Sequence, residues 1–385
     1  MPNKKRTKIV ATLGPATSDK KTLKAMIQQG VDVFRINFSH ADYDDVKKRI
    51  KMIRELGKEL HTSTAILGDL QGPKLRVGIM KEEVVVQPGD TISFCTGTEF
   101  EGTAKKVYMN YDNFPKDVNP GERILLDDGK LMFEVEATNK KDTVKAKVIQ
   151  GGPLRSRKGV NLPNTNISLP ALTKKDKEDA IFAISQEVDW IALSFVRHAE
   201  DLKELQALIE AHSEYKIPII AKIEKPEAVK NIDKIIAYCD GLMVARGDLG
   251  VEVPAQEVPL IQKELVLTAK RARIPVIIAT QMMETMITSL TPTRAEVNDV
   301  ANSVMDGADA VMLSGETSVG KYPVEVIQTM AKICKSVENS SLIQVPHEPP
   351  HIRTNRYITK SVCYHASHMA NEIKAKGSNK RENSR

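Results

Sequence analysis

Short apolar runs rich in β-branched residues alternate with amphipathic stretches along most of the chain. The runs have the length of buried strands, and the stretches between them place apolar residues on one face at helical spacing. The eight predicted strands are Lys8–Thr12, Val31–Phe38, Thr64–Leu70, Val188–Phe195, Ile217–Ile223, Gly241–Ala245, Pro275–Thr280 and Asp309–Leu313. The predicted helices are Lys20–Gln29, Asp44–Leu60, Lys174–Ser185, Ala199–Ala211, Ala228–Tyr238, Glu257–Arg271, Arg294–Met305 and Pro323–Val337. Parallel strands need helical crossovers, so the pattern predicts an α/β fold, a (β/α)₈ barrel, with an open doubly wound sheet as the alternative.

Two parts of the chain depart from this alternation. Residues 73–163, after the third strand, are rich in Val, Thr and Gly, contain turns such as Pro88-Gly89-Asp90, and predict an inserted β-rich lid domain. The barrel would then comprise residues 1–72 and 164–340. Residues 341–385 predict a linker, Pro-rich at 345–350, and the start of an incomplete C-terminal α/β domain.

The C-terminal part predicts one helix, over 359–376, followed by a frayed polar tail from Gly377. An apolar face on that helix, without a partner, would favour poor solubility or self-association. The residues on this face are Val362, Ala366, Met369, Ala370 and Ile373.

Composition narrows the function classes. The 385 residues are 41% hydrophobic and 28% charged, which is typical of a folded globular protein. The net charge of +6 is mild and suits anionic small molecules, while 4% aromatic residues disfavour nucleic-acid stacking platforms. A short basic run at the N-terminus, Lys4 to Lys8, is typical of a solvated segment.

Cysteine spacing and hydropathy indicate a cytoplasmic protein. The four cysteines lie far apart, form no zinc-ligand spacing and suggest a reducing compartment. No signal-peptide apolar region follows the basic N-terminus, and no apolar run approaches a membrane span.

Polar and charged residues gather where the predicted strands end. The carboxyl ends of barrel strands form the active-site rim in this architecture, so we predict the site there. In strand order, from the second to the eighth, the residues are Arg35, Asn37, Ser39 and His40; Asp69; Ser194, Phe195 and Arg197; Lys222 and Glu224; Arg246, Gly247 and Asp248; Thr280, Gln281 and Glu284; Ser314 and Glu316.

Glu224 and Asp248 form a candidate metal pair. Two carboxylates that leave room for water and substrate suit Mg²⁺, whereas the scarcity of histidines disfavours zinc. The alternative is that Glu224 caps the helix that follows it. Lys222 lies on the same strand face, and a lysine in a barrel mouth requires an anion, which is either a ligand or merely Glu224.

Arg35, Arg76 and Lys158 add positive charge to this rim. Phosphoryl transfer depends mainly on positioning and charge stabilisation, so a metal with several cations favours that reaction. The chain contains no GxxxxGK[ST] motif and no kinase glycine-rich loop, so a nucleotide would bind in another way.

Six motifs resemble those of the pyruvate kinase family, occur in the family's order and cover residues 5–340. The family's barrel, with a lid inserted after the third strand, also matches the layout predicted above. The motifs are Thr7–Thr17 (TKIVATLGPAT), Phe34–His40 (FRINFSH), Ala221–Glu224 (AKIE), Met243–Glu252 (MVARGDLGVE), Ala279–Met283 (ATQMM) and Met312–Thr317 (MLSGET).

The resemblance implies the last step of glycolysis, Mg²⁺-dependent phosphoryl transfer from phosphoenolpyruvate to ADP, giving pyruvate and ATP. It implies that Glu224 and Asp248 hold Mg²⁺, that Lys222 stabilises the moving phosphoryl group, and that Arg35 binds the substrate phosphate. Gly247, Asp248 and Thr280 would contact the substrate, with Thr280 near the carbon that takes up a proton or orienting a water there. The nucleotide side would be lined by Asn37, His40, Arg76 and Lys158.

The chain departs from the family at the end of the third strand. Many members need K⁺ and have a turn resembling DTKGPEIR, where this chain has Asp69-Leu-Gln-Gly-Pro-Lys-Leu-Arg76. The ammonium of Lys74 could supply the charge that K⁺ otherwise brings, so we predict K⁺-independent activity, although the cation-site residues Asn37, Ser39 and Asp69 remain. The alternative is a solvated Lys74 at the lid hinge.

The second departure is length, since the family's C-terminal domain normally continues further and carries an oligomer interface, usually of a homotetramer. The chain therefore resembles a truncated member. Two alternatives to the kinase stay open at this point: a Mg²⁺-dependent lyase or mutase acting on pyruvate-like enolates, and an inactive paralogue that only binds ligands.

Overall fold

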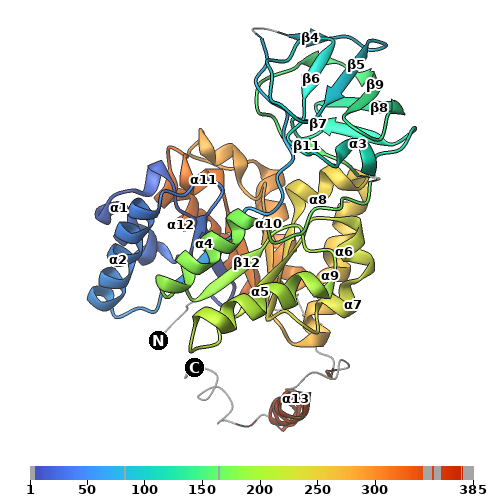
Figure 1. Cartoon of the computed structure of the whole chain (residues 1–385). Helices are drawn as coiled ribbons and strands as arrows, with labels where there is room; N and C mark the ends of the chain where they lie inside the picture. Colours follow the sequence, from blue (N-terminus) through green and yellow to red (C-terminus); the bar gives the residue numbers. More distant parts are fainter. Residues whose placement is uncertain are drawn as a thin grey trace.

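Eight parallel strands form a closed barrel in the computed structural model, which describes residues 5–81, 84–163, 165–340, 349–350, 357–373 and 375 (Figure 1). The first strand pairs with the second on one side and with the last on the other. This closure confirms the barrel and excludes the open sheet. The barrel strands are β1 (Lys8–Thr12), β2 (Val33–Asn37), β3 (Ala65–Asp69), β12 (Trp190–Leu193), β13 (Ile219–Ile223), β14 (Gly241–Ala245), β15 (Val276–Ala279) and β16 (Ala310–Leu313).

Helices cover the outside of the barrel (Figure 1). Local side-chain contacts set where several of these helices begin and end. Thr173 with Asp176, and Thr293 with Glu296, form capping boxes at two helix starts. Gly30, at φ 116°, ends the first helix. The helices around the barrel are α1 (Lys20–Gln29), α2 (Tyr43–Leu60), α4 (Lys174–Ser185), α5 (Ala199–His212), α6 (Pro226–Lys230), α7 (Ile232–Ile235), α8 (Arg246–Glu252), α9 (Val258–Ala272), α10 (Arg294–Asp306), α11 (Gly315–Ser318) and α12 (Pro323–Glu338), with 3₁₀ turns at Pro15–Thr17, Ala255–Glu257 and Glu284–Ile287.

The single helix predicted over Ala228–Tyr238 is wrong. The structure has two short helices there, α6 and α7, separated at Asn231, whose φ of −99° and ψ of 11° interrupt the helical path. The Asn231 side chain donates a hydrogen bond of 3.1 Å to the carbonyl of Arg197. A side-chain contact to a neighbouring loop therefore overrides the helical periodicity.

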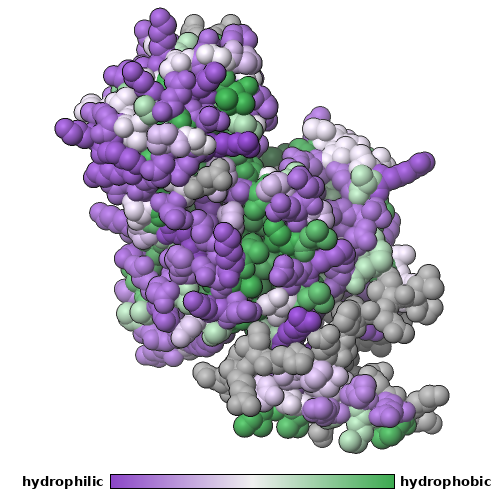
Figure 2. Space-filling model, turned by 90° about the vertical axis from the view of Figure 1, so that its right-hand side faces the viewer, coloured by the Kyte–Doolittle hydropathy of each residue, from purple (hydrophilic) through white to green (hydrophobic). Residues whose placement is uncertain are grey.

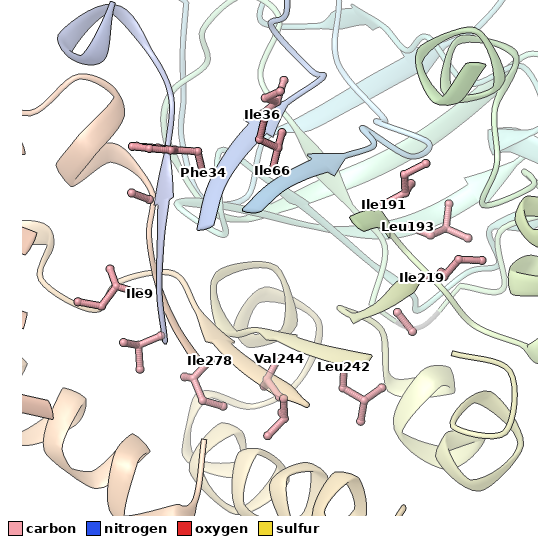
Figure 3. Close-up of a cluster of buried hydrophobic side chains, with 14 of the residues drawn as sticks. Ile9, Phe34, Ile36, Ile66, Ile191, Leu193, Ile219, Leu242, Val244 and Ile278 are labelled. Atoms are coloured by element: carbon pink, nitrogen blue, oxygen red, sulfur yellow. The ribbon is translucent and has the colours of Figure 1, made fainter. Parts of the chain in front are cut away.

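The core of the barrel has two layers. Figure 3 shows Ile9, Phe34, Ile66, Leu242 and other strand residues pointing away from the barrel centre. These outward side chains pack against the surrounding helices. The alternate residues fill the barrel interior and are Val10, Leu67, Ala192, Ile220, Met243, Ile277, Ala279, Ala310 and Met312. Both faces of each strand are thus buried, which explains the nearly continuous apolar runs.

The stretch after β3 folds into separate β-structure above the barrel (Figure 1). A six-stranded sheet has the order β11-β7-β8-β9-β5-β6, and β4 pairs with β10. The strands are β4 (Val85–Val86), β5 (Thr91–Cys95), β6 (Lys106–Tyr108), β7 (Arg123–Leu126), β8 (Leu131–Thr138), β9 (Thr143–Gln150), β10 (Gly152–Pro153) and β11 (Val160–Asn161). One short helix, α3 (Phe114–Asp117), is an addition to the predicted all-β insert.

This insert has its own apolar core, in which Phe94, Phe114 and Phe133 are fully buried and pack edge to face. Its visible surface is mainly hydrophilic (Figure 2). The structure thus has the β-rich architecture expected of a lid, while the domain limits at 72/73 and 163/164 stay a prediction.

Beyond the barrel, α13 (Tyr357–Glu372) lies at the end of the molecule away from the insert (Figure 1). Val362, Met369 and Ile373 are 62%, 61% and 69% exposed, and apolar residues appear at the lower edge of Figure 2. Most of the predicted linker at 345–350 and the tail from Gly377 lie outside the described residues. Among the described helices, none combines the length and the apolar character that a bilayer crossing requires.

Candidate active site

The polar residues of the rim occupy inward-facing strand positions. Side chains alternate along a strand, so the residues in step with the interior Val10, Leu67 and Ile220 also face inward. In β1, β3 and β13 the next inward positions, two residues further along, are Thr12, Asp69 and Lys222. In each case a polar side chain therefore replaces the apolar filling at the carboxyl end of the barrel.

The centre of the site is a buried network around Asp69 and Lys222. The Lys222 ammonium lies 3.2 Å from Asp69 Oδ1 and 3.0 Å from Glu224 Oε1, and it donates a 2.6 Å hydrogen bond to Ser194 Oγ. Arg35 donates through Nε to Asp69 Oδ2 at 2.5 Å and through Nη1 to Thr12 Oγ1 at 3.0 Å. Side chains from β1, β2, β3 and β13 thus converge on one cluster.

Burial and charge act in opposite directions within this cluster. Burial by itself raises the pKa of Asp69, but the Lys222 and Arg35 cations hold it below its ordinary value. Burial by itself lowers the pKa of Lys222, yet the Asp69 and Glu224 carboxylates raise it above its ordinary value. Lys222 is therefore a fixed cation at the barrel mouth.

The negative charges of the two predicted metal ligands, Glu224 and Asp248, are less well balanced by nearby cations. Burial raises the pKa of Glu224 although Lys222 is adjacent, and burial also raises the pKa of Asp248 against the effects of Lys222 and Lys74. Glu224 Oε2 accepts a 2.7 Å hydrogen bond from the Phe195 amide. No described residue donates a hydrogen bond to the Asp248 carboxylate. A divalent cation would supply the missing positive charge.

The oxygen donors fit Mg²⁺. Within the described part of the chain, no group of three or more His, Cys, Asp or Glu side chains could form a metal cage. A pair of carboxylates, completed by water and substrate oxygens, is how Mg²⁺ is usually held.

Asp248 lies in α8, a short helix anchored at its first residues. Arg246 forms a two-pronged ion pair with Asp299, with both N–O distances at 2.7 Å, and donates a 2.9 Å hydrogen bond to the Thr280 carbonyl. The Gly247 amide donates to Thr280 Oγ1 at 2.7 Å. Thr280 itself has φ 72°, an uncommon conformation for a β-branched residue.

The predicted cation site contains the Lys74 ammonium. Lys74 Nζ donates a 3.0 Å hydrogen bond to Ser39 Oγ, and the Ser39 amide donates to Asn37 Oδ1 at 3.2 Å. Asn37 and Asp69 are direct neighbours in the β2–β3 register. Burial, with Arg76, lowers the pKa of Lys74, while Asp248 and Asp69 favour its charged form.

The four residues predicted for the nucleotide side divide between two cavities. Arg76 and Lys158 line a cavity of 280 Å³ between the insert and the barrel, which also contains Lys74 and Asp248. Asn37 and His40 line a second cavity, of 450 Å³, formed by the ends of β1 and β2 with α2 and the chain after α11. In the first cavity, Lys158 is paired with Asp127 at 2.8 Å.

The pKa of His40 reports on the positive charges of Lys74 and Arg76 near it. Burial, followed by Lys74 and Arg76, lowers the pKa of His40 below 6.5. A folded-state pKa below the unfolded value means that the neutral imidazole is favoured. The resulting stability is fully present above pH 6.5 and is lost as pH falls toward the folded pKa.

We expect the ring protons of His40, followed by NMR and assigned with His40→Gln, to titrate below pH 6.5. Lys74→Met should move the midpoint upward in part, because burial and Arg76 remain. An unchanged midpoint in Lys74→Met would place the lysine charge elsewhere.

Other rim residues have structural contacts. Glu316 accepts hydrogen bonds from the amides of Met283 and Ser314, at 3.1 and 2.7 Å, and so shapes the turn after β15. Arg197 donates to the carbonyls of Ile167 and Leu169 in the chain that returns from the insert. Sequence reasoning gave no role to Lys225, Glu252 and Asn161, which meet beside the site. Glu252 ends the motif Met243–Glu252, but nothing in the sequence indicates its partners.

A closed (β/α)₈ barrel, with carboxylates and cations converging at the carboxyl ends of its strands, defines the class of barrel enzymes. The family model described as pyruvate kinase, barrel domain, matches residues 4–327. The chain belongs to the pyruvate kinase family, whose members are kinases and hence phosphotransferases.

Three relatives support this membership. The chain is 49% identical to pyruvate kinase 2 of Synechocystis sp. over 89% of its length, 45% identical to the pyruvate kinase of Corynebacterium efficiens over 97%, and 46% identical to that of Geobacillus stearothermophilus over 88%. It spans 58% of the length of the Synechocystis and Geobacillus proteins and 77% of the Corynebacterium protein.

Proposed function

We propose that this chain transfers the phosphoryl group of phosphoenolpyruvate to ADP, giving pyruvate and ATP. The observation that carries the proposal is the Lys222 ammonium, held 3.0 Å from Glu224 and 3.2 Å from Asp69 at the mouth of the barrel. A permanently charged donor fixed beside two carboxylates suits an anionic group that moves between two oxygens.

In this reaction the bond between phosphorus and the enol oxygen breaks, and a bond from phosphorus to a terminal oxygen of ADP forms. Lys222 would stabilise the charge on the phosphoryl oxygens during the transfer. Arg35 would bind the substrate phosphate with its Nη2 group, since its Nε and Nη1 groups are used by Asp69 and Thr12. Preorganised donors of this kind need no rearrangement as the charge develops.

Glu224 and Asp248 would hold a divalent cation, for which we propose Mg²⁺. When bound, Mg²⁺ would neutralise charge on the substrate carboxylate and phosphate. The partly buried position of Asp248 and the raised pKa values of both carboxyls support a site that is completed by a cation.

Loss of the phosphoryl group leaves the enolate of pyruvate, which takes up a proton at carbon to become the ketone. Thr280 is the residue that we place at this step, either as the donor or through a water that it orients. The support is positional: its Oγ1 accepts the Gly247 amide at 2.7 Å, beside Asp248. A Cβ at Gly247 would lie 3.2 Å from Thr280 Oγ1, so glycine keeps this contact uncrowded, and its bare backbone would let the substrate approach closely.

For ADP we propose both cavities. Arg76 and Lys158 would bind phosphate oxygens beneath the insert, and Asn37 and His40 would line the neighbouring part of the nucleotide site. The insert would act as a lid that excludes water, which would otherwise compete with ADP for the phosphoryl group.

We further propose that the reaction needs no K⁺. The Lys74 ammonium is hydrogen-bonded to Ser39, within the group of Asn37, Ser39 and Asp69 that resembles the cation site. One positive charge in this place makes a second monovalent cation unnecessary. Four free cysteines agree with a reducing compartment, and we propose a cytoplasmic location.

The test is ATP formation from phosphoenolpyruvate and ADP, with Mg²⁺ present and K⁺ absent. We expect turnover that requires ADP and is abolished by a chelator. Consumption of phosphoenolpyruvate without ADP would favour the lyase or mutase. No turnover with or without K⁺, in a sample whose circular dichroism shows a folded α/β protein, would favour the inactive paralogue.

A further inference from the structure

The two chain segments that carry Glu224 and Asp248 are joined by a buried ion pair. Lys225 directly follows Glu224, and Glu252 is the last residue of α8, the helix that carries Asp248. Lys225 Nζ lies 2.7 Å from Glu252 Oε1, and the two side chains are only 8% and 0% exposed. This pair therefore links the two candidate metal carboxylates independently of the barrel strands.

The insert contributes a third group to this pair. Asn161 Nδ2 donates a 2.9 Å hydrogen bond to the same Oε1 atom of Glu252. Asn161 lies in β11, an edge strand of the six-stranded sheet, and it pairs there with Leu125 in β7. The position of this amide is thus fixed by the sheet of the insert, whereas its acceptor belongs to the barrel. We call Asn161, Lys225 and Glu252 the α8 latch.

A second contact places the insert over α8. The turn after β7 contains Gly129, where a Cβ would lie 4.0 Å from Val251 Cγ1 in α8. Asp128, in the same turn, lines the same cavity as Asp248. The turn after β7 therefore lies against the end of α8 and contributes a carboxylate to the cavity of Asp248.

Glu252 also has a buried atom with no hydrogen-bond partner in the described part of the chain, Oε2. The carboxylate is held through Oε1 alone, so its placement depends on Lys225 and Asn161 together. α8 has only seven residues and is anchored at its first two by Arg246 and Gly247. Glu252 follows Asp248 by four residues, about one turn, so Glu252 holds the far end of the helix that carries Asp248.

We propose that the α8 latch couples the orientation of the insert to the metal site, with Asn161 acting as a positioning residue for Asp248 through Glu252. This inference rests on the proposed function, because it takes Glu224 and Asp248 as the metal pair. When the insert moves away, the Asn161 hydrogen bond breaks, α8 is less constrained, and the divalent cation binds more weakly.

The experiment measures Mn²⁺ binding by electron paramagnetic resonance on the full chain, without phosphoenolpyruvate or ADP, together with hydrogen exchange at 125–129. We expect Asn161→Ala to raise the Kd for Mn²⁺ about three- to tenfold, the range of a single hydrogen bond, and to speed exchange in the turn. The matched control is Asn119→Ala, since Asn119 donates a 3.1 Å hydrogen bond to Glu122 within the insert. Its Kd should stay within about twofold of the parent.

A second background tests whether Asn161 acts through Glu252. Lys225→Met with Glu252→Leu replaces both members of the buried pair by apolar groups, which avoids leaving one charge unpaired. In this background, if its melting temperature shows that it folds, Asn161→Ala should no longer change the Kd for Mn²⁺.

Two results would overturn the proposal. One is a Kd for Asn161→Ala that equals that of Asn119→Ala, whatever happens to hydrogen exchange. The other is an undiminished effect of Asn161→Ala in the apolar background. Mn²⁺ binding is measured without the reaction, so a parent chain that makes no ATP but shows the coupling would refute the proposed function alone.

Discussion

Replacing Lys222 by Met is expected to reduce kcat for ATP formation by roughly 10³–10⁵-fold, the range for removing a cation from a transferred phosphoryl group. Glu224 and Asp69, which flank the ammonium at 3.0 and 3.2 Å, cannot replace its charge. The measurement is steady-state ATP formation at saturating substrates, with Lys216→Met as a control. Lys216 precedes the same strand but is 64% exposed and paired with Asp240 at the surface.

The same variant should be less stable. Two buried carboxylates lose their shared cation, and breaking a buried pair costs about 3–5 kcal/mol in the free energy of unfolding. The loss should grow with pH, because proton uptake by Asp69 or Glu224 relieves it at low pH. Chemical denaturation at two pH values measures this. A variant that retains near-parent kcat would exclude Lys222 from the transfer step, whatever its stability.

Lys74→Glu is expected to make activity dependent on K⁺. Without K⁺ the substitution replaces the cation beside Ser39 with an anion, and kcat should fall about 10²–10³-fold, the range for losing one preorganised electrostatic contact. Added KCl should restore much of this loss, because the new carboxylate, with Asn37, Ser39 and Asp69, offers oxygen ligands to the ion. The measurement is kcat against KCl at constant ionic strength, held with tetramethylammonium chloride.

Lys147→Glu is the matched control for this change. Lys147 is exposed on β9 of the insert, so the same charge reversal there should leave kcat without K⁺ unaltered. Lys74→Glu with parent-like kinetics in the absence of K⁺ would mean that Lys74 is a solvated hinge residue. A loss that KCl does not restore would mean that Lys74 has a direct role in binding substrate.

Most of the fold was predictable because its determinants are local. Each predicted barrel strand lies within two residues of its observed limits at both ends. The largest difference is at Val188–Phe195, where the observed strand is two residues shorter at each end, Trp190–Leu193. The Val31–Phe38 run likewise narrows to Val33–Asn37. Burial on both faces of a parallel sheet leaves a clear apolar signal, whereas strand ends depend on pairing.

The position of the candidate site was predictable, but the hydrogen bonds and ion pairs between its residues were not. Lys222 and Asp248 could be found because charged residues stand near the carboxyl ends of apolar strands, and these ends share one rim in a barrel. The sequence contains no sign that Asn161 in the insert meets Glu252, 91 positions away, or that Arg246 is anchored by Asp299. Such pairs depend on how separate elements are packed.

The sequence by itself therefore determined the strands of the barrel, most of its helices, the insert and the kinds of residue at the rim, because periodicity and turn chemistry act over a few residues. Only the tertiary structure decided how these groups are paired. It placed Lys222 between Asp69 and Glu224, brought the Lys74 ammonium to Ser39, and joined the insert to α8 through Asn161. The physical reason is that hydrogen bonds and ion pairs act over about 3 Å, and closing the barrel brings such distant residues within that range.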